Sequence, residues 1–302
     1  MSIRALTHEN NENCVPRIKN SHSSRHRAFG TDITNVMFTS KSENQDSKDP
    51  LYLGEYANDI YNYLHQTETI YLPRPGYMTI QESINEKMRS ILIDWLVEVH
   101  HKFKLVEETL FLTVNIVDRY LEKTQVIREN LQLVGVSSML IACKYEEIYA
   151  PEIKDFVYIT DSAYTAEQVL ETENNILRCL CFNLTTPSTF RFLQRYARVC
   201  EIDEYAFNFA RYLIELALVE YKFLKYKPSN IAASAMYLTQ KILKNCSRSL
   251  SEQTTNTDAE IRVCAKDLAL VLQRAENFTL QAVRKKFMHQ KYFEVAKLQV
   301  KI

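Results

Sequence analysis

The sequence contains very little glycine. Only four glycines occur in 302 residues, at positions 30, 54, 76 and 135. This scarcity excludes the GxGxxG and P-loop types of phosphate-binding loop, which need several glycines close together. The metalloprotease motif HExxH and the hydrolase motif GxSxG are absent as well. We therefore expect neither a catalytic site nor a bound cofactor.

Net charge and long apolar runs are also lacking. Lysine plus arginine and aspartate plus glutamate both number 37, which gives no electrostatic reason to expect nucleic acid or an anionic membrane as the main partner. The most membrane-like stretch, LQLVGVSSMLIAC at 131–143, is too short to span a bilayer. The first residues, MSIRALTHENNENC, lack the apolar core of a secretory signal. We expect no membrane partner and no nucleic-acid partner.

The cysteines point to a reducing compartment. Their number, seven, is odd and agrees with free thiols. Cys179 and Cys181 lie one residue apart, but no second cysteine pair or nearby histidine completes a zinc site. We expect no metal, and we expect the protein in the nucleus and cytoplasm.

Helical periodicity, in contrast, is abundant. Residues 1–50 are polar and poor in bulky apolar side chains, so they are predicted to form a disordered tail. From Leu51 onward, apolar residues recur at helical spacing almost to the end. The prediction is an all-α fold with helices at 52–68, 85–103, 107–121, 128–147, 151–159, 165–181, 187–200, 204–221, 228–244, 260–275 and 279–288.

Two stretches suggest that a helical domain is duplicated. LQLVGVSSMLIACKY and SNIAASAMYLTQKIL each predict a helix with small residues along one side, which lets neighbouring helices approach closely. Two unrelated alanine-rich helices remain the alternative. Pro187 suits the start of a helix, and it follows the short connector NLTT. We place the domain boundary there, which gives a tail at 1–50, a first domain at 51–184 and a second at 185–302.

The stretch MRSILIDWLVEV at 88–99 is apolar around most of a helix circumference. At about 100° per residue, two neighbouring apolar stripes form. Ser90, Asp94 and Glu98 hold the remaining polar strip, and Arg89 projects into the apolar arc. Such a helix either runs through the centre of a domain or uses its second stripe for a partner. The stripes are Met88, Ile91, Leu92, Trp95 and Val99, and Ile93, Leu96, Val97 and His100.

Two pairs of charged residues need an explanation. Asp118 shares an apolar stripe with Phe111, Val114 and Leu121, so it points inward as Arg89 does. Because a lone buried charge is costly, we infer that Arg89 and Asp118 form a structural ion pair. For Lys144, spacing alone predicts only an exposed lysine paired with Glu146 or Glu147, and Glu173 is equally ordinary.

The stretches MRSILIDWLVEV, ETLFLTVNIVDRYL, LQLVGVSSMLIACKYEEIYAPEI and DFVYITDSAYT resemble the first cyclin box of the mitotic cyclins, and the resemblance continues through TPSTFRFLQRYA. It implies two tandem boxes of five helices with an N-terminal helix, and a regulatory subunit that binds and activates a cyclin-dependent protein kinase. GYMTIQESINEKMRSIL looks more like the A type than the B type. An S, G2 or M-phase role of A-type character is therefore expected, with a B-type cyclin for entry into M phase as the alternative.

The family's signature residues are all present, namely Arg89, Leu92, Asp118, Lys144 and Glu173. By resemblance, kinase contacts are expected from residues in both halves of the first domain. Lys144 and Glu173 match positions that contact the mobile αC helix of the kinase. The full expected set is Tyr56, Ile60, Lys144, Tyr145, Glu173 and Phe182.

The resemblance also implies a docking patch for Arg-x-Leu motifs of substrates and inhibitors. Its apolar residues belong to the first stripe of 88–99, and Met88, Leu92 and Trp95 are expected to face solvent. The alternative is that Trp95 is simply core. The expected patch comprises Met88, Ile91, Leu92, Trp95, Glu98, Arg128, Leu131 and Gln132.

The tail segment RHRAFGTDITN partly resembles the destruction box read by a ubiquitin ligase, with Arg27, Phe29, Ile33 and Asn35 as the matching residues. Phe29 replaces the usual leucine.

Two other classes of protein are alternatives. A double-cyclin-box transcription factor should carry a basic face, and a helical-bundle enzyme should carry Glu-x-x-His ligands. The charge balance and the missing ligands disfavour both.

Overall fold

The computed structural model describes residues 56–244 and 254–298, which belong to one compact unit, Ser40–Ile302. The expected tail and its partial destruction box lie outside the described residues. Within them the fold is all-α, as predicted, and no strand occurs. The helices are Ala57–Thr67 (α2), Glu86–Phe103 (α3), Glu107–Lys123 (α4), Leu131–Glu146 (α5), Ile153–Ile159 (α6), Ala166–Cys179 (α7), Thr189–Val199 (α8), Glu204–Val219 (α9), Pro228–Leu243 (α10), Asp258–Arg274 (α11) and Ala282–Phe287 (α12).

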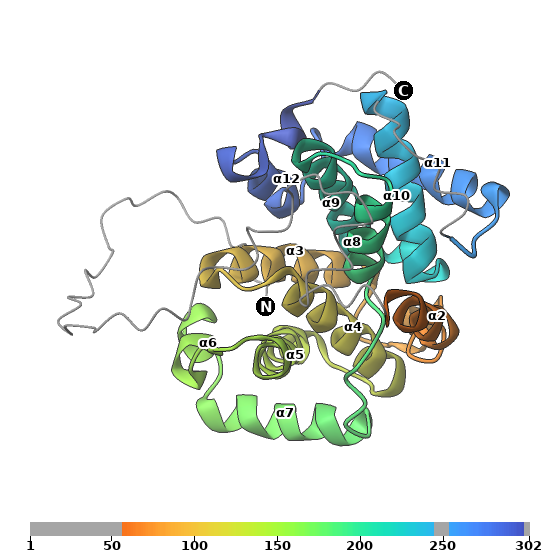
Figure 1. The fold of residues 1–302 in the computed structure, drawn as a ribbon. Coiled ribbons are helices and arrows are strands. Elements are labelled where there is room, and N and C mark those ends of the chain that lie inside the picture. The colour runs from red at the N-terminus through yellow and green to blue at the C-terminus, as the bar shows by residue number, and fades with distance from the viewer. Residues whose placement is uncertain (1–55, 245–253, 299–302) are drawn as a thin grey trace, which may run out of the picture. The chain divides into compact units, whose positions relative to one another are not determined.

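Helix α5 is the centre of the first box, which comprises α3 to α7. Every residue from Leu133 to Cys143 is buried, and α3, α4, α6 and α7 pack around it (Figure 1). A Cβ added at Gly135 would lie 2.7 Å from Cδ1 of Leu92 on α3, so this glycine permits a close helix crossing. The small residues of the stretch therefore serve the packing that the sequence predicted.

Helix α10 holds the corresponding place in the second box, which comprises α8 to α12. Residues 232–236 are all fully buried, and α8, α9 and α11 pack against this helix. The predicted duplication of a helical domain is thus confirmed by the positions of α5 and α10. Pro228 is the first residue of α10, as its missing N–H predicts.

The local start signals in the sequence also hold. Thr165 accepts from the backbone N–H of Gln168, whose side chain accepts from the N–H of Thr165 in return, a complete capping box for α7. Helix α8 begins two residues after Pro187, because Ser188 is the residue that caps it.

Helix α3 lies between the two boxes, and this explains its unusual pattern. One face joins the first-box core through Leu92, Leu96 and Val99. On the other face, Ser90 donates to the carbonyl of Val219 and Asp94 accepts from the N–H of Ala282, so these two residues of the polar strip meet the second box, whereas Glu98 stays exposed. Helices α9 and α12 pack on this side of α3. Both apolar stripes are therefore largely occupied within the chain.

In the part of the chain that the structure describes, no helix is long and apolar enough to cross a membrane. Over the same residues, no cluster of three or more His, Cys, Asp or Glu side chains is placed to hold a metal ion.

Candidate protein-interaction site

Arg89 and Asp118 form a buried, two-pronged ion pair between α3 and α4. Nε of Arg89 donates to Oδ1 of Asp118 at 2.6 Å, and Nη2 donates to Oδ2 at 2.7 Å. Tyr77 donates its hydroxyl to the same carboxylate at 2.7 Å, and Nη1 of Arg89 donates to the carbonyl of Leu218 at 3.1 Å. This is the contact that the helix pattern led us to expect, and its last bond ties the first box to the second.

The environment of Arg89 holds its guanidinium in the charged form. Burial alone would lower the pKa of Arg89, but the charge of Asp118 and the bonds to it outweigh burial, and the pKa is raised. Burial and then the Asp118 charge raise the pKa of Tyr77, which therefore stays a hydroxyl donor. The pair is saturated with hydrogen bonds and has a structural role, not a catalytic one.

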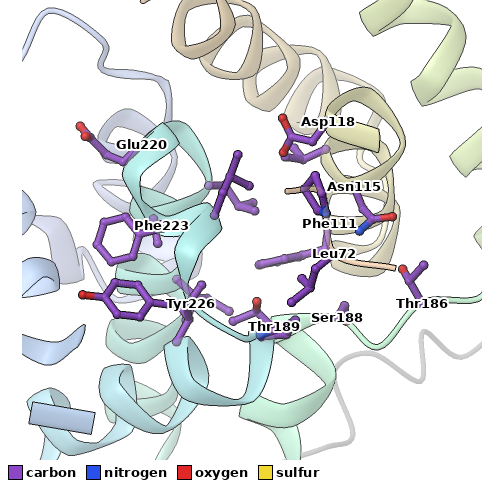
Figure 2. A pocket seen from close by; sticks show the side chains of 18 of the residues that line it. Leu72, Phe111, Asn115, Asp118, Thr186, Ser188, Thr189, Glu220, Phe223 and Tyr226 are labelled. Atoms are coloured by element: carbon purple, nitrogen blue, oxygen red, sulfur yellow. The ribbon is translucent and has the colours of Figure 1, made fainter. Parts of the chain in front are cut away.

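A cavity of about 90 Å³ lies next to this pair, at the joint between the boxes (Figure 2). Phe111 and Asn115 of α4 line one side, and Phe223 and Tyr226 line the other. Its polar walls already have partners, since Tyr226 donates to Asp267 at 2.7 Å and Glu220 pairs with Arg274. The cavity is lined largely by apolar side chains. Its volume is smaller than the ~150 Å³ of a cavity that holds benzene. No acid, base and nucleophile converge there.

Lys144 and Glu173 meet at the surface of the first box. Nζ of Lys144, in the last turn of α5, lies 2.7 and 2.8 Å from the two carboxylate oxygens of Glu173 on α7. The lysine side chain is half exposed, whereas that of Glu173 is mostly buried. The pairing with Glu146 or Glu147 that spacing predicted is wrong, because Glu147 instead accepts from the N–H of Val106 and the hydroxyl of Thr109.

Exposed large apolar side chains lie close to Lys144 in the sequence. Tyr145 follows Lys144, is 46% exposed and bonds to Thr185, which brings the C-terminal end of α5 beside the segment that carries exposed Phe182. The sequence reasoning missed two residues here, Ile148 and Tyr149, which are 86% and 92% exposed. Their signal was present in CKYEEIYAPEI, since two bulky apolar residues directly follow a helix end. A cluster of this kind usually marks a binding surface.

The two remaining expected kinase contacts are on α2. Tyr56 precedes the helix and is exposed, and Ile60 is half-buried in its first turns. Side-chain bonds from α2 to α8 attach it to the second box, as when the hydroxyl of Tyr61 donates to the carbonyl of Arg191. The structure thus places these two residues on a different element from Lys144 and Glu173.

The expected docking patch needs a correction. Leu92 and Leu131 are buried, at 5% and 4% exposure, and belong to the first-box core. Leu92 points at Gly135, where the missing side chain leaves room for it. Exposed or partly exposed surface remains on Met88, Ile91, Trp95, Glu98, Arg128 and Gln132.

Sequence comparison identifies both boxes. The family model "Cyclin, N-terminal domain" matches residues 59–185, and "Cyclin, C-terminal domain" matches residues 186–301. The chain belongs to the cyclin family. Cyclins are regulatory subunits rather than enzymes.

Its relatives include mitotic cyclins. A G2/mitotic-specific cyclin-B of Marthasterias glacialis is 48% identical, over 84% of this chain and 66% of its own length. A G2/mitotic-specific cyclin-B2 of Oryzias luzonensis is 43% identical, over 84% of this chain and 67% of its own length. A third relative, from Spisula solidissima, is covered over only 59% of its length, so this cyclin spans about three fifths to two thirds of these relatives. Their names are B-type, so the expected likeness to the A type is not supported.

Solved structures share the fold. A viral cyclin from herpesvirus saimiri matches 70% of this chain and 96% of its own, with a TM-score of 0.62 at 22% identity. A chain of the yeast RNA Pol II CTD kinase CTDK-1 complex matches 76% of this chain and 87% of its own, with a TM-score of 0.57 at 14% identity.

Proposed function

We propose that this cyclin is of the mitotic B type and binds and activates a cyclin-dependent Ser/Thr protein kinase, promoting entry into M phase. The observation that carries the proposal is the Lys144–Glu173 pair, which offers an accessible charge amid exposed Tyr145, Ile148 and Tyr149. The B-type names of its relatives favour the mitotic assignment. One structurally similar chain comes from a kinase complex, which fits a kinase as partner.

The proposed mechanism is a shift in the kinase's conformational equilibrium. An inactive kinase lacks the ion pair between its αC glutamate and its catalytic lysine, which the active form requires. A partner that binds the active form more tightly raises its population by that difference in affinity. Here the apolar cluster would supply buried area against the kinase, and Lys144 would supply a charge that fixes the orientation.

Reconstitution tests the proposal. The purified chain is incubated alone, and then with a monomeric cyclin-dependent kinase, and phosphorylation of a short proline-directed peptide is measured. The proposal expects no activity from the chain alone and strong activation of the kinase when the two are mixed. A kinase that stays at its basal rate over a full titration would contradict it.

We also propose that the solvent-accessible part of the patch, with exposed Ile91 and half-buried Met88 and Trp95, docks Arg-x-Leu motifs. Docking raises the effective concentration of a phosphorylation site without changing the chemistry of the kinase. Met88→Ala with Ile91→Ala should therefore weaken phosphorylation of a substrate with a distal Arg-x-Leu motif, and spare a short peptide that lacks one. Equal loss on both substrates would refute the docking role. Ile80→Ala, an exposed change away from α3, serves as control.

A further inference from the structure

Helix α2 is held in an unusual way. None of the residues from Ala57 to Thr67 is buried. A surface helix is ordinarily attached by an apolar stripe that packs against the core. The buried residue of this segment is instead a charged one, Glu68, which follows the helix directly and is 2% exposed. The position of α2 therefore depends on where this carboxylate goes.

Glu68 reaches the beginning of α10, the central helix of the second box. Its Oε2 accepts from the backbone N–H of Ser229 at 3.0 Å, and its Oε1 accepts from the Ser229 hydroxyl at 2.9 Å. Pro228 has no N–H to offer and Lys227, the N-cap residue, makes no side-chain cap bond, so Ser229 carries the first amide of the helix that can be satisfied. A residue distant in sequence thus supplies the missing cap, with the negative charge that a helix N-terminus favours.

Further contacts attach the rest of α2 to α8 of the same box. The ring of His65 lies 4.8 Å from that of Phe192, centroid to centroid, and the guanidinium of Arg195 lies 5.3 Å from the ring centre of Tyr61. Arg195 also donates to Asn58 at 3.3 Å. These contacts are partly exposed, whereas the Glu68 contact is buried. Glu68 is therefore the fixed point about which the others orient the helix.

We propose that Glu68 is a positioning residue, which locks α2 onto α10 and so presents Tyr56 and Ile60 to the kinase in one orientation. This inference rests on the proposed function. A helix that is already docked loses less conformational freedom on binding than one that must first be ordered, and the affinity is higher by that difference. Without the carboxylate, α2 keeps its exposed contacts but loses its buried anchor.

The test compares Glu68→Ala with Asp203→Ala, a variant that removes another carboxylate helix cap in the same box. Asp203 caps α9 by accepting from the N–H of Ala206 at 2.7 Å. Both variants remove a helix cap, and both should lower the melting temperature. Only Glu68→Ala should weaken kinase binding, by roughly tenfold, because only it frees α2. Glu68→Gln keeps an acceptor for Ser229 and should fall between wild type and Glu68→Ala.

A double-mutant cycle adds a readout that a purely structural role would not change. Tyr56→Ala should cost less kinase affinity in the Glu68→Ala background than in the wild type, because an unanchored helix no longer presents Tyr56. Hydrogen exchange of the 57–67 amides should be faster in Glu68→Ala than in Asp203→Ala.

The failures can be told apart. A wild-type chain that binds no kinase overturns the proposed function and the role of Glu68 with it. A wild-type chain that binds kinase while Glu68→Ala matches either wild type or Asp203→Ala overturns only the inference. Additive effects of Tyr56→Ala and Glu68→Ala do the same.

Discussion

The two ion pairs of the first box differ mainly in their access to solvent. The side chains of Arg89 and Asp118 are 1% and 2% exposed, and further bonds come from Tyr77 and the carbonyl of Leu218. In the second pair, the side chain of Lys144 is 51% exposed. Both pairs join neighbouring helices at similar distances. Their surroundings, rather than their geometry, separate a charge that serves the fold from one that a partner can reach.

The energetics follow the same division. Removing one partner of a buried pair leaves an uncompensated charge away from water, which costs several kcal/mol. The Lys144–Glu173 pair reaches solvent through its half-exposed lysine, so it is partly screened and contributes less to folding than the fully buried pair. The comparison predicts large stability effects and small interface effects at Arg89, and the reverse at Lys144.

Arg89→Ala is the strongest way to test the buried side of this comparison. We expect the free energy of unfolding to fall by about 3 to 5 kcal/mol, because Asp118 is left buried without its cation. Chemical denaturation of wild type and variant measures this directly. The double variant Arg89→Met with Asp118→Leu, which removes both charges, should lose less than Arg89→Ala. An unchanged unfolding midpoint in Arg89→Ala would mean that the arginine reaches solvent.

Leu92→Ala and Ile91→Ala sharpen the comparison between core and surface on α3 itself. Leu92 fills the space beside Gly135, so its truncation should cost about 3 kcal/mol of stability. Ile91 is exposed at its neighbouring position, and its truncation should cost less than about 1 kcal/mol. Thermal melts of the two variants measure both losses of stability. Equal losses would show that both side chains are core, and the docking proposal would then lose its most exposed apolar contact on α3.

Helix patterns predicted which residues turn inward on α3, but not what covers each face. Arg89 and Asp118 could be paired from sequence because each lies within an apolar arc and neither can be buried alone. Leu92 is not on the surface as expected, because Gly135 on α5 leaves room for it in the first-box core, and periodicity does not show which helix a stripe packs against. The polar strip of Ser90 and Asp94 gave no hint that it would face α9 and α12.

The comparison of charged groups extends to Asp94 of α3, a carboxylate that accepts a hydrogen bond from the backbone N–H of Ala282. Burial raises its pKa from 3.8 to about 6, although the N–H of Ala282 opposes this. Because the folded state then holds the proton more tightly than the unfolded chain, the contribution of Asp94 to stability decreases as pH rises from about 4 to about 6. Asp94→Asn removes this titration and keeps an acceptor for Ala282.

Unfolding free energies of wild type and Asp94→Asn across that pH range test the point. The stability of the wild type relative to the variant should decrease toward neutral pH, by about 1 kcal/mol or less, because the carboxylate is partly exposed and screened. A difference that is constant with pH would show that Asp94 titrates normally in the folded chain, and one that grows in favour of wild type would show a lowered pKa, so either result would contradict the prediction.

Contacts between segments far apart in the chain could not be predicted from the sequence. Glu68 ends the helix predicted at 52–68, where periodicity gives it no partner, and Ser229 is 161 residues away. Ile148 and Tyr149 were visible as apolar residues but not as exposed ones. The family could be predicted because it is carried by several long matching stretches, whereas the A or B subtype depended on a few positions, and the expected likeness to the A type is not supported by the B-type names of the relatives.

A charge swap tests the central claim most directly. Lys144→Glu with Glu173→Lys keeps an ion pair between α5 and α7 but reverses the charge that a partner meets. The account predicts a double variant that still folds, with a smaller loss of unfolding free energy than Arg89→Ala shows, and loss of kinase activation on a short peptide substrate. Activation by the folded double variant at the wild-type level would contradict it, because the pair would then serve only to join two helices.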